Sequence, residues 1–410
     1  MMRITSIRQD AARCFAERGF PTTRDEEWRF TNVSSLAKTQ FSTAPAGLNV
    51  WEGEQLDLSL FPNEGGPRLI FINGLYSPEL STGKLPRGIL ATPLSEANGA
   101  AEKHLARYAS CQDRAFVALN TANFEDGACI DIPNGVVVED PIHLVFFATG
   151  CEVPVISHPR SLIVVGAGSH ATVVESYIGH GAKYFTNAVT EIVAGDRSVV
   201  DHYKLQEEDE RSSHVATLQA EVGRDANFST HSISLGGGGL VRNDINAVLA
   251  EGSEAIVNGL YLASGSQHID NHTAIDHAKP HGTSHELYKG ILGGTATGVF
   301  NGKIIVHKDA QKTDAKQTNR NLVLSENATI HTKPELQIHA NDVRCTHGAT
   351  IGQLDQEAIF YLQSRGIGKE QARDLLMHAF ARDIIDRVKV GSLRVRLEQM
   401  LLERLHALRN

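Results

Sequence analysis

A cysteine and a histidine two residues apart are the side chains in this sequence best placed for chemistry. Cys345 and His347 lie in the segment 334–367, which has a strand pattern as far as His347 and a helical pattern from Asp355 onwards. Side chains two apart share one face of a strand, so we expect the thiol and the imidazole side by side. Such a pair can bind a soft metal or take part in redox chemistry. The residues alone favour the alternative, a buried thiol beside a hydrogen-bonded histidine.

A second group of potential metal ligands lies within residues 268–286. It consists of five histidines with three carboxylates among them: His268, His272, His277, His281, His285, Asp270, Asp276 and Glu286. On a strand, His268, Asp270 and His272 would share one face, as the ligands of a stand-alone metalloenzyme could. The alternative is that these polar side chains satisfy one another on stacked strands or lie in water.

Other catalytic and redox patterns find no support in the sequence. The glycines at 236–239 lack the Lys-Ser/Thr and the helix start of a phosphate-binding loop. No Ser/His/Asp set or carboxylate pair can be placed, which argues against a hydrolase. The cysteines are few, odd in number and without a CxxC motif, so we expect free thiols in a reducing compartment at Cys14, Cys111, Cys129, Cys151 and Cys345.

Composition narrows the class of protein further. The 410 residues are 41% hydrophobic and carry a net charge of −9, which argues against a nucleic-acid-binding protein. No apolar run is long enough to span a membrane, and the N-terminus lacks the apolar core of a signal peptide. We therefore expect a cytoplasmic protein that binds neither nucleic acid nor membrane.

The elements that must position these side chains fall into three zones. Residues 1–110 mix short helical patterns with loops, residues 111–352 are rich in β-branched runs, and residues 353–410 are helical. In the middle zone a glycine is followed three residues later by a small residue at intervals of 27, 28 and 29 residues, starting at Gly168, Gly195, Gly223 and Gly252. This period predicts a solenoid of stacked β-coils. A β-sandwich or jelly roll is the alternative.

Helical patterns occupy both ends of the chain. Residues 7–18 predict an amphipathic helix, and RDEEWRFT at 24–31 predicts an aromatic anchor whose charges lie in solvent. Asp355 is a plausible N-cap of a helix that ends at Gly366. Two further helices are predicted by apolar stripes at helical spacing, one at Ala372, Leu375, Leu376, Ala379 and Phe380, the other at Leu393, Leu397, Met400, Leu401, Leu405 and Leu408. We expect this tail to cap the solenoid or to bind a partner.

Three long motifs resemble the SufB/SufD family of iron–sulfur cluster assembly proteins. They are SHELYKGILGGTATGVFNGKIIV at 284–306, HKDAQKTDAKQTNRNLVLS at 307–325, and the segment 334–367 with NDVRCTHGAT. The resemblance covers roughly residues 110–390 and is weaker before them. Cys345 and His347 match the Cys-x-His of the SufD branch. The SufB branch has its main cysteine a few residues earlier, where this chain has Ala340.

The resemblance implies a right-handed parallel β-helix with N- and C-terminal helical domains, at 1–110, 111–352 and 353–410. It implies a non-catalytic scaffold that pairs with SufB and docks the SufC ATPase on the region of Asp355, Phe360, Tyr361, Arg365 and Gly366. His347, with Cys345, would receive transient iron or nascent cluster. No tightly bound cofactor is expected. A flavin in the complex and a homodimer of the isolated chain stay open. The alternative of a β-helix enzyme that acts on polysaccharide has no support, because the sequence shows no cluster of acidic and basic residues that would line its groove.

Overall fold

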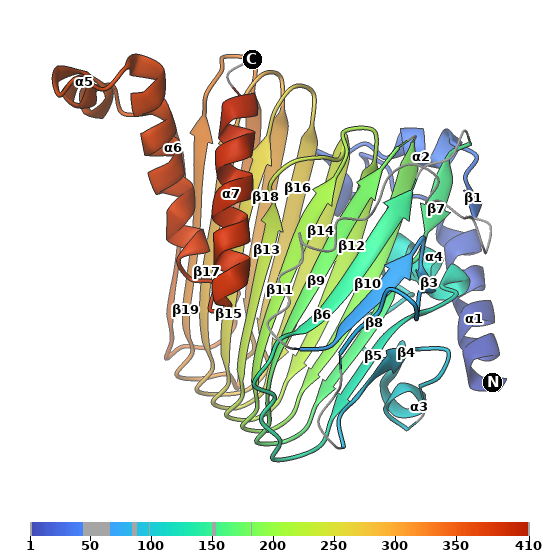
Figure 1. Ribbon diagram of the computed structural model, residues 1–410. Helices are drawn as coiled ribbons and strands as arrows, with labels where there is room; N and C mark the ends of the chain where they lie inside the picture. Colours follow the sequence, from blue (N-terminus) through green and yellow to red (C-terminus); the bar gives the residue numbers. More distant parts are fainter. Residues whose placement is uncertain are drawn as a thin grey trace.

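Two sheets of mainly parallel strands, wound alternately by one chain, form the body of the protein (Figure 1). The computed structural model describes residues 2–43, 66–83, 88–97, 99–149, 153–181 and 183–408. Each long strand pairs with the strand two places along the chain, so successive coils stack on one another. This confirms the parallel β-helix with helices at both ends, and it excludes the sandwich alternative. Within the described ranges, no helix is both long and apolar enough to cross a membrane.

The first sheet, sheet A, has eleven strands. Its main path runs through β4 (Leu90–Pro93), β5 (Gly127–Ile132), β8 (Arg160–Val165), β10 (Tyr184–Ala194), β12 (Ser213–Val222), β14 (Leu240–Leu249), β16 (His268–His277), β18 (Thr297–Val306) and β20 (Thr329–Ile338), with β1 (Ser42–Thr43) and β7 (Val155–Ser157) beside it. The antiparallel pair in this sheet is β4 with β5.

The second sheet, sheet B, has ten strands. They are β3 (Leu75–Tyr76), β2 (Arg68–Ile72), β6 (Ile142–Thr149), β9 (His170–His180), β11 (Val199–Glu208), β13 (Asn227–Ser234), β15 (Glu254–Ala263), β17 (Thr283–Leu292), β19 (Asp314–Val323) and β21 (Arg344–Gly352). Strands β20 and β21 therefore close the same end of the two sheets.

The register confirms the repeat period but gives it a different basis. His170, Val199, Asn227 and Glu254 pair in turn, at separations of 29, 28 and 27 residues. A residue with positive φ recurs two positions before these strands and before the next two of sheet B: Gly168, Arg197, Asp225, Gly252, His281 and Lys312. The turn thus requires a left-handed conformation that only two of these positions fill with glycine.

Gly195 and Gly223 belong to another position of the turn, so the expected series of equivalent glycines was wrong. A Cβ atom at either residue would lie 2.7 Å from a backbone nitrogen of the preceding coil, Ala167 N or Asp196 N. Close approach of neighbouring turns, rather than backbone conformation, therefore explains these glycines. The spacing stayed near 28 because both positions recur once per coil.

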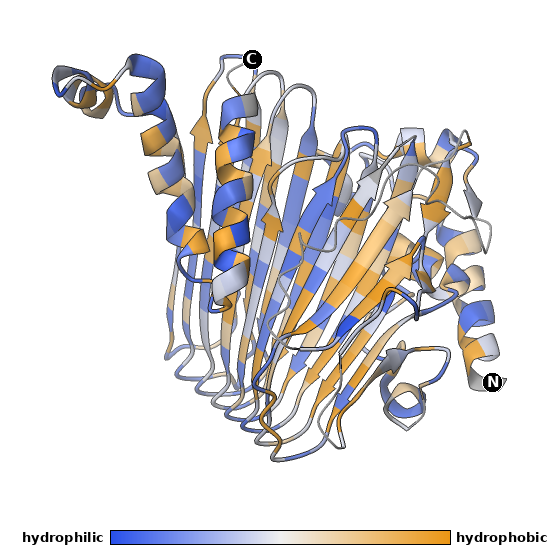
Figure 2. Cartoon of the chain, viewed as in Figure 1, coloured by the Kyte–Doolittle hydropathy of each residue, from blue (hydrophilic) through white to orange (hydrophobic). Residues whose placement is uncertain are grey.

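The interior changes from apolar to polar along the solenoid. Strands of the first coils are mostly hydrophobic, whereas those of the last coils carry many polar residues (Figure 2). In the middle coils, buried carboxylates meet buried histidines: Glu175 lies 3.2 Å from His202, and Glu208 lies 2.9 Å from His214. Burial lowers the pKa of the enclosed Lys204 ammonium to about 8. The solenoid therefore holds charge in its core through paired polar groups.

The N-terminal segment forms a layer of helices over sheet A that runs from its first coils to β16 and β18. It contains α1 (Met2–Arg18), the 3-10 helix η1 (Glu26–Trp28), α2 (Ser34–Lys38), α3 (Ala100–His104) and α4 (Ala115–Asn123). Arg160 and Glu191, both fully buried, form an ion pair of 2.6 Å. Glu191 also accepts hydrogen bonds from the backbone nitrogens of Ala106, Tyr108 and Ala109. This buried carboxylate fixes the loop between α3 and α4 onto sheet A.

The C-terminal helices α5 (Gln356–Ser364), α6 (Lys369–Ile385) and α7 (Gly391–Ala407) follow the last strand. Helices α6 and α7 lie along sheet B, and α5 projects beyond it (Figure 1). The α7 stripe is confirmed because five of its six members are buried in one cluster with outer side chains of sheet B and Leu408 packs against it. The α6 stripe was partly wrong: Leu375 is 46% exposed and Ala379 is exposed as well. Met377, Ala381, Ile384 and Ile385 complete the buried face.

One buried lysine fixes α6 to the solenoid. Lys289 on β17 donates to the carbonyl oxygen of Phe380 at 3.0 Å and lies 2.8 Å from the Asp383 carboxylate. Its ammonium also lies 4.7 Å from the centroid of the Phe380 ring. The Lys289 ammonium is desolvated and has three partners on α6, so these contacts fix the position of α6 along sheet B.

Candidate functional site at the open end of the solenoid

Cys345 and His347 lie on β21, the terminal strand of sheet B. Cys345 pairs in register with Ala315, and His347 pairs with Gln317. Ala315 and Gln317 are both buried in the solenoid, so the parallel register directs the thiol and the imidazole toward the same inner side. Cys345 is half-buried and His347 is exposed, because no further strand of the described chain covers this end.

The thiol is the less available of the two groups. Burial raises the pKa of Cys345, which keeps the sulfur protonated near neutral pH. Its side chain packs against a small apolar cluster that includes Ile304 and Ala340. The sequence pattern had placed Ala340 within a strand. In the structure it lies two residues beyond the end of β20.

Two polar side chains lie directly behind His347 in the column of stacked coils. Gln317 on β19 donates through Nε2 to Glu286 Oε2 on β17 at 2.8 Å. Burial raises the pKa of Glu286 to about 7, against the opposing effect of hydrogen bonds from Thr273 and Gln317. Gln317 Oε1 has no hydrogen-bond partner among the described residues. A polar column thus leads from the solenoid interior to the exposed imidazole.

The histidine-rich segment does not form one metal centre. His268 and His272 lie on β16 of sheet A, His281 lies in a turn, and His285 is exposed on β17 of sheet B. Asp270 lies 3.0 Å from His272 as a shared face allows, but it is also paired with Arg242 at 2.7 Å and accepts from the Thr31 hydroxyl at 2.5 Å. The described ranges contain no group of three His, Cys, Asp or Glu side chains arranged to hold a metal ion.

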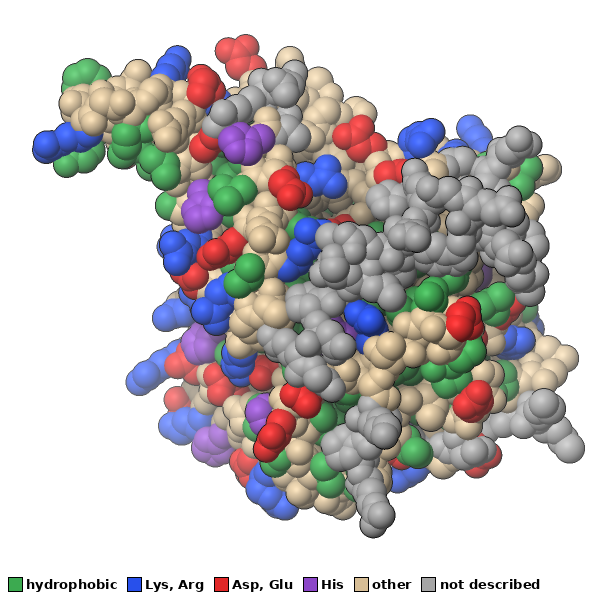
Figure 3. Space-filling view, in the orientation of Figure 1, with side chains coloured by type: hydrophobic (Ala, Val, Ile, Leu, Met, Phe, Trp, Pro, Cys, Tyr) green, Lys and Arg blue, Asp and Glu red, His purple; other side chains and the backbone are tan. Residues whose placement is uncertain are grey.

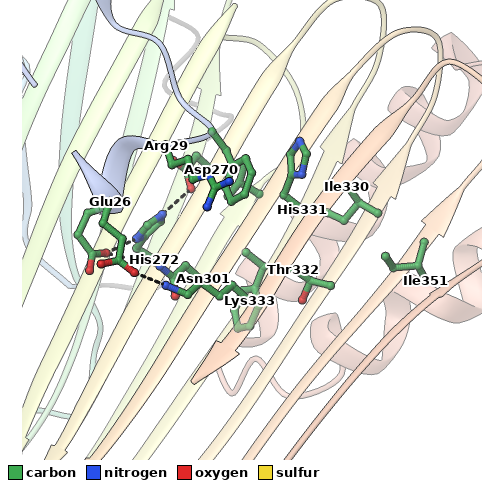
Figure 4. A pocket seen from close by; sticks show the side chains of 14 residues that line it. Glu26, Arg29, Asp270, His272, Asn301, Ile330, His331, Thr332, Lys333 and Ile351 are labelled. Atoms are coloured by element: carbon green, nitrogen blue, oxygen red, sulfur yellow. Dashed lines mark hydrogen bonds and ion pairs between the residues drawn. The ribbon is translucent and has the colours of Figure 1, made fainter. Parts of the chain in front are cut away.

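The segment 24–31 clamps onto the outer face of sheet A. As expected, its charged residues Arg24, Asp25, Glu26 and Arg29 are exposed, but the half-exposed Glu27 is paired with charges of the sheet. Glu27 lies 3.2 Å from His272, which also contacts Asp270 (Figure 4), and 3.3 Å from Lys303. Arg242 donates to the Glu27 carbonyl at 2.7 Å, and its guanidinium lies 4.0 Å from the Trp28 ring centroid. The aromatic anchor itself is confirmed by the contact of Trp28 with Phe116. We call residues 26–31 the N-terminal clamp.

A cavity of about 410 Å³ remains between the clamp and the last strands of sheet A. Phe30 from the clamp and His331 from β20 stack at 4.2 Å along one side of it (Figure 4). The hydrogen bond from His272 and the charge of Lys303 outweigh burial and lower the pKa of Glu27 to about 2. The clamp is therefore held by charge at neutral pH, close to the open end.

The projecting helix α5 carries an exposed apolar patch. Figure 3 shows hydrophobic side chains on the surface of this projecting helix. Phe360 is 74% exposed and Tyr361 is 57% exposed, and the Arg365 guanidinium lies 5.2 Å from the Tyr361 ring centroid. Asp355 caps the helix by accepting from the backbone nitrogens of Glu357 and Ala358, as the sequence predicted. Gly366 ends the helix region with φ of 85°. Exposed aromatic side chains on one helix are typical of a protein-binding surface.

Replacing Glu27 by Gln tests the clamp. We expect the free energy of unfolding to fall by about 0.5–1 kcal/mol at pH 6, because the half-exposed carboxylate loses its charge partners. Glu27 stabilises above its usual pKa of 4.5 and loses this effect as the pH falls to about 2, so the difference should vanish there. Denaturant titrations at several pH values measure it. Glu17→Gln, an exposed position on α1 outside the clamp, is the control, and an equal loss in both variants contradicts the clamp.

Replacing Glu286 by Gln tests the buried acid behind His347. The folded protein holds this proton more tightly than the unfolded chain, so wild-type stability falls as the pH rises from 4.5 to about 7. The Gln variant does not titrate there. Its free energy of unfolding relative to wild type should therefore rise by roughly 2–3 kcal/mol across this window. Glu326→Gln, in an exposed turn, should show no such slope; parallel curves for Glu286→Gln and wild type would exclude a buried acid.

Comparisons with known proteins agree with this architecture. Residues 146–380 match the family model described as SUF system FeS cluster assembly, SufBD core domain, and residues 1–144 match the SufBD protein N-terminal region. The chain is similar to an iron–sulfur cluster assembly SufBD family protein of Synechocystis, with 37% identity over 97% of this chain and 90% of the relative.

Two similar bacterial proteins carry the name SufD. The iron–sulfur cluster assembly protein SufD of Escherichia coli is 30% identical over 94% of this chain and 90% of its own length. The protein of that name from Bacillus subtilis is 27% identical over 69% of this chain and 65% of its own length. With the core model covering more than half of the chain, the protein belongs to the SufB/SufD family of iron–sulfur cluster assembly proteins, with relatives named SufD.

Proposed function

We propose that this chain is a non-catalytic scaffold subunit of a cytoplasmic iron–sulfur cluster assembly complex, paired with a SufB-type subunit and a SufC-type ATPase. The observation that carries the proposal is the open end of the solenoid, where the last strand presents an exposed imidazole. A terminal strand offers unpaired backbone groups to a strand of another chain. A SufB-type solenoid would pair there, and in isolation a second copy of this chain could use the same edge.

His347 is the residue that we assign to iron or nascent cluster at this interface. Imidazole nitrogen is a suitable iron ligand, and this side chain is accessible from the partner side. Cys345 plays a smaller part in the proposal, because its half-buried thiol has a raised pKa. Iron and cluster are cargo in this scheme rather than resident cofactors. Any flavin would belong to the assembled complex.

The ATPase is proposed to bind α5. Phe360 and Tyr361 would be the apolar anchors, with Arg365 beside them and with Asp355 and Gly366 fixing the ends of the helix. Helix α5 packs on α6, which Lys289 attaches to β17. Strand β17 pairs with β19, and β19 pairs with β21. ATP-driven movement of the docked subunit would therefore reach His347 through three neighbouring strands.

The His347→Ala substitution tests the iron assignment in the complete complex. We expect the iron and sulfide content of the purified complex to fall at least roughly tenfold, because the ligand nitrogen is removed. Subunit composition should stay unchanged. The control is His339→Ala, which removes another exposed histidine near the same end. Normal cluster content in the His347→Ala complex would sink the assignment.

The double substitution Phe360→Ser and Tyr361→Ser tests the docking surface. We expect capture of the SufC-type ATPase to weaken at least about tenfold, because exposed aromatic anchors contribute strongly to binding. Pairing with the SufB-type subunit should be retained. The control is Leu402→Ser on α7, where the side chain is 48% exposed. Unchanged capture of the ATPase by the double variant would show that its binding site is not formed by these side chains of α5.

A further inference from the structure

Two cysteines that lie 97 positions apart in the sequence are in direct contact in the N-terminal layer. Cys14 on α1 and Cys111, in the loop between α3 and α4, place their sulfur atoms 3.6 Å apart. Both side chains are half-buried, so small oxidants in solvent can reach them. The proposed function does not use either thiol.

Several contacts on both sides fix this thiol pair. Arg18 donates to the carbonyl oxygen of Gln112, the residue next to Cys111, and Arg8 donates to the carbonyl oxygen of Phe124. The ring of Phe20, just beyond α1, lies 5.7 Å from that of Phe116 on α4. Helix α1 is thus held against α4 along its length, and the sulfur contact follows from this packing.

We propose that Cys14 and Cys111 form a reversible disulfide, a modification site that ties helix α1 to the loop before α4. A peroxide supplies the oxidising equivalent. It transfers one oxygen atom to one thiolate, giving a sulfenic acid, and its other oxygen leaves as water. The second thiolate then attacks that sulfur, the S–S bond forms, and the hydroxyl leaves as a second water. A small dithiol reverses the step by thiol–disulfide exchange.

The other described cysteines have no such partner in reach. Cys129 is buried in the apolar cluster beneath α3, and Cys345 lies at the opposite end of the chain's solenoid. Cys151 lies outside the described residues.

Burial and the neighbouring thiol raise the pKa of Cys111 to about 11. Oxidation should therefore be faster at alkaline pH, where the thiolate is more abundant.

The bond would act on the N-terminal layer as a unit. Helix α1 leads directly into the N-terminal clamp, which holds sheet A through Glu27 and Trp28. In the reduced protein, α1 is attached by non-covalent contacts alone. In the oxidised protein the segment between Cys14 and Cys111 becomes a closed loop, which restricts the unfolded chain and keeps the clamp near its site.

Treatment of the full chain with hydrogen peroxide, followed by alkylation and peptide mapping, tests the proposal. We expect a linked peptide containing Cys14 and Cys111, loss of two alkylatable thiols, and reversal by dithiothreitol. The oxidised protein should unfold at a Tm at least about 3 °C higher than the reduced protein. Cys14→Ser and Cys111→Ser should each abolish both effects.

Cys129→Ser is the matched control, and it should leave the linked peptide and the rise in Tm unchanged. The proposal is overturned if Cys14 and Cys111 stay alkylatable under conditions that oxidise Cys345. It is also overturned if peroxide drives either sulfur to the sulfinic acid without a cross-link. These measurements need no iron, cluster or partner subunit, so their outcome is independent of the proposed assembly function.

Discussion

Stacking of each coil on the preceding one is the constraint on which this structure depends. A single coil cannot satisfy its backbone hydrogen bonds or cover its inner face, so it needs a neighbour in register on either side. The ladder that begins at β5 and β6 meets this need until β20 and β21, where the described chain provides no further coil. The site lies where the repeat stops, because the unsatisfied edge and the exposed His347 occur there together.

The N-terminal and C-terminal regions cover different outer faces of the solenoid. The face of sheet B is apolar where α6 and α7 cover it, and the buried cluster includes Tyr203, Leu205 and Leu260. The face of sheet A is polar under the N-terminal clamp, where Arg242 and Asp270 are both buried and paired. Hydrophobic burial is therefore the main contact beneath α6 and α7, with Lys289 as an added polar attachment. Directed hydrogen bonds and ion pairs hold the clamp beside the Trp28 anchor.

Much of the fold could be predicted from the sequence because its signals are local or periodic. The N-cap at Asp355, the α7 stripe and the spacing near 28 residues each depend on a short pattern. The equivalent turn residues could not be predicted, since Arg197 and Asp225 take the same left-handed conformation as Gly168. The exposure of Leu375 depends on the angle at which α6 meets sheet B, which the stripe does not specify.

The site was predictable in part. Cys345 and His347 could be chosen as candidates because they are two residues apart. Glu286 and Gln317 were not linked to them, since the column joins residues 30 or 31 positions apart through the register. The clamp was missed for the same reason: Glu27 and His272 lie 245 positions apart. The available signal was a charge cluster beside a tryptophan, but that pattern does not predict which distant residues pair with the cluster.

The polar interior of the last coils has a consequence for how the end of the solenoid behaves in water. If leucine and valine lined the open end, the last coil would expose a hydrophobic surface to water. Such a surface tends to associate permanently or to aggregate. Here the end carries the exposed His347, with the buried Gln317 and Glu286 behind it in the same column, beside the small apolar cluster that holds Cys345. This end can therefore be wet or covered at modest cost.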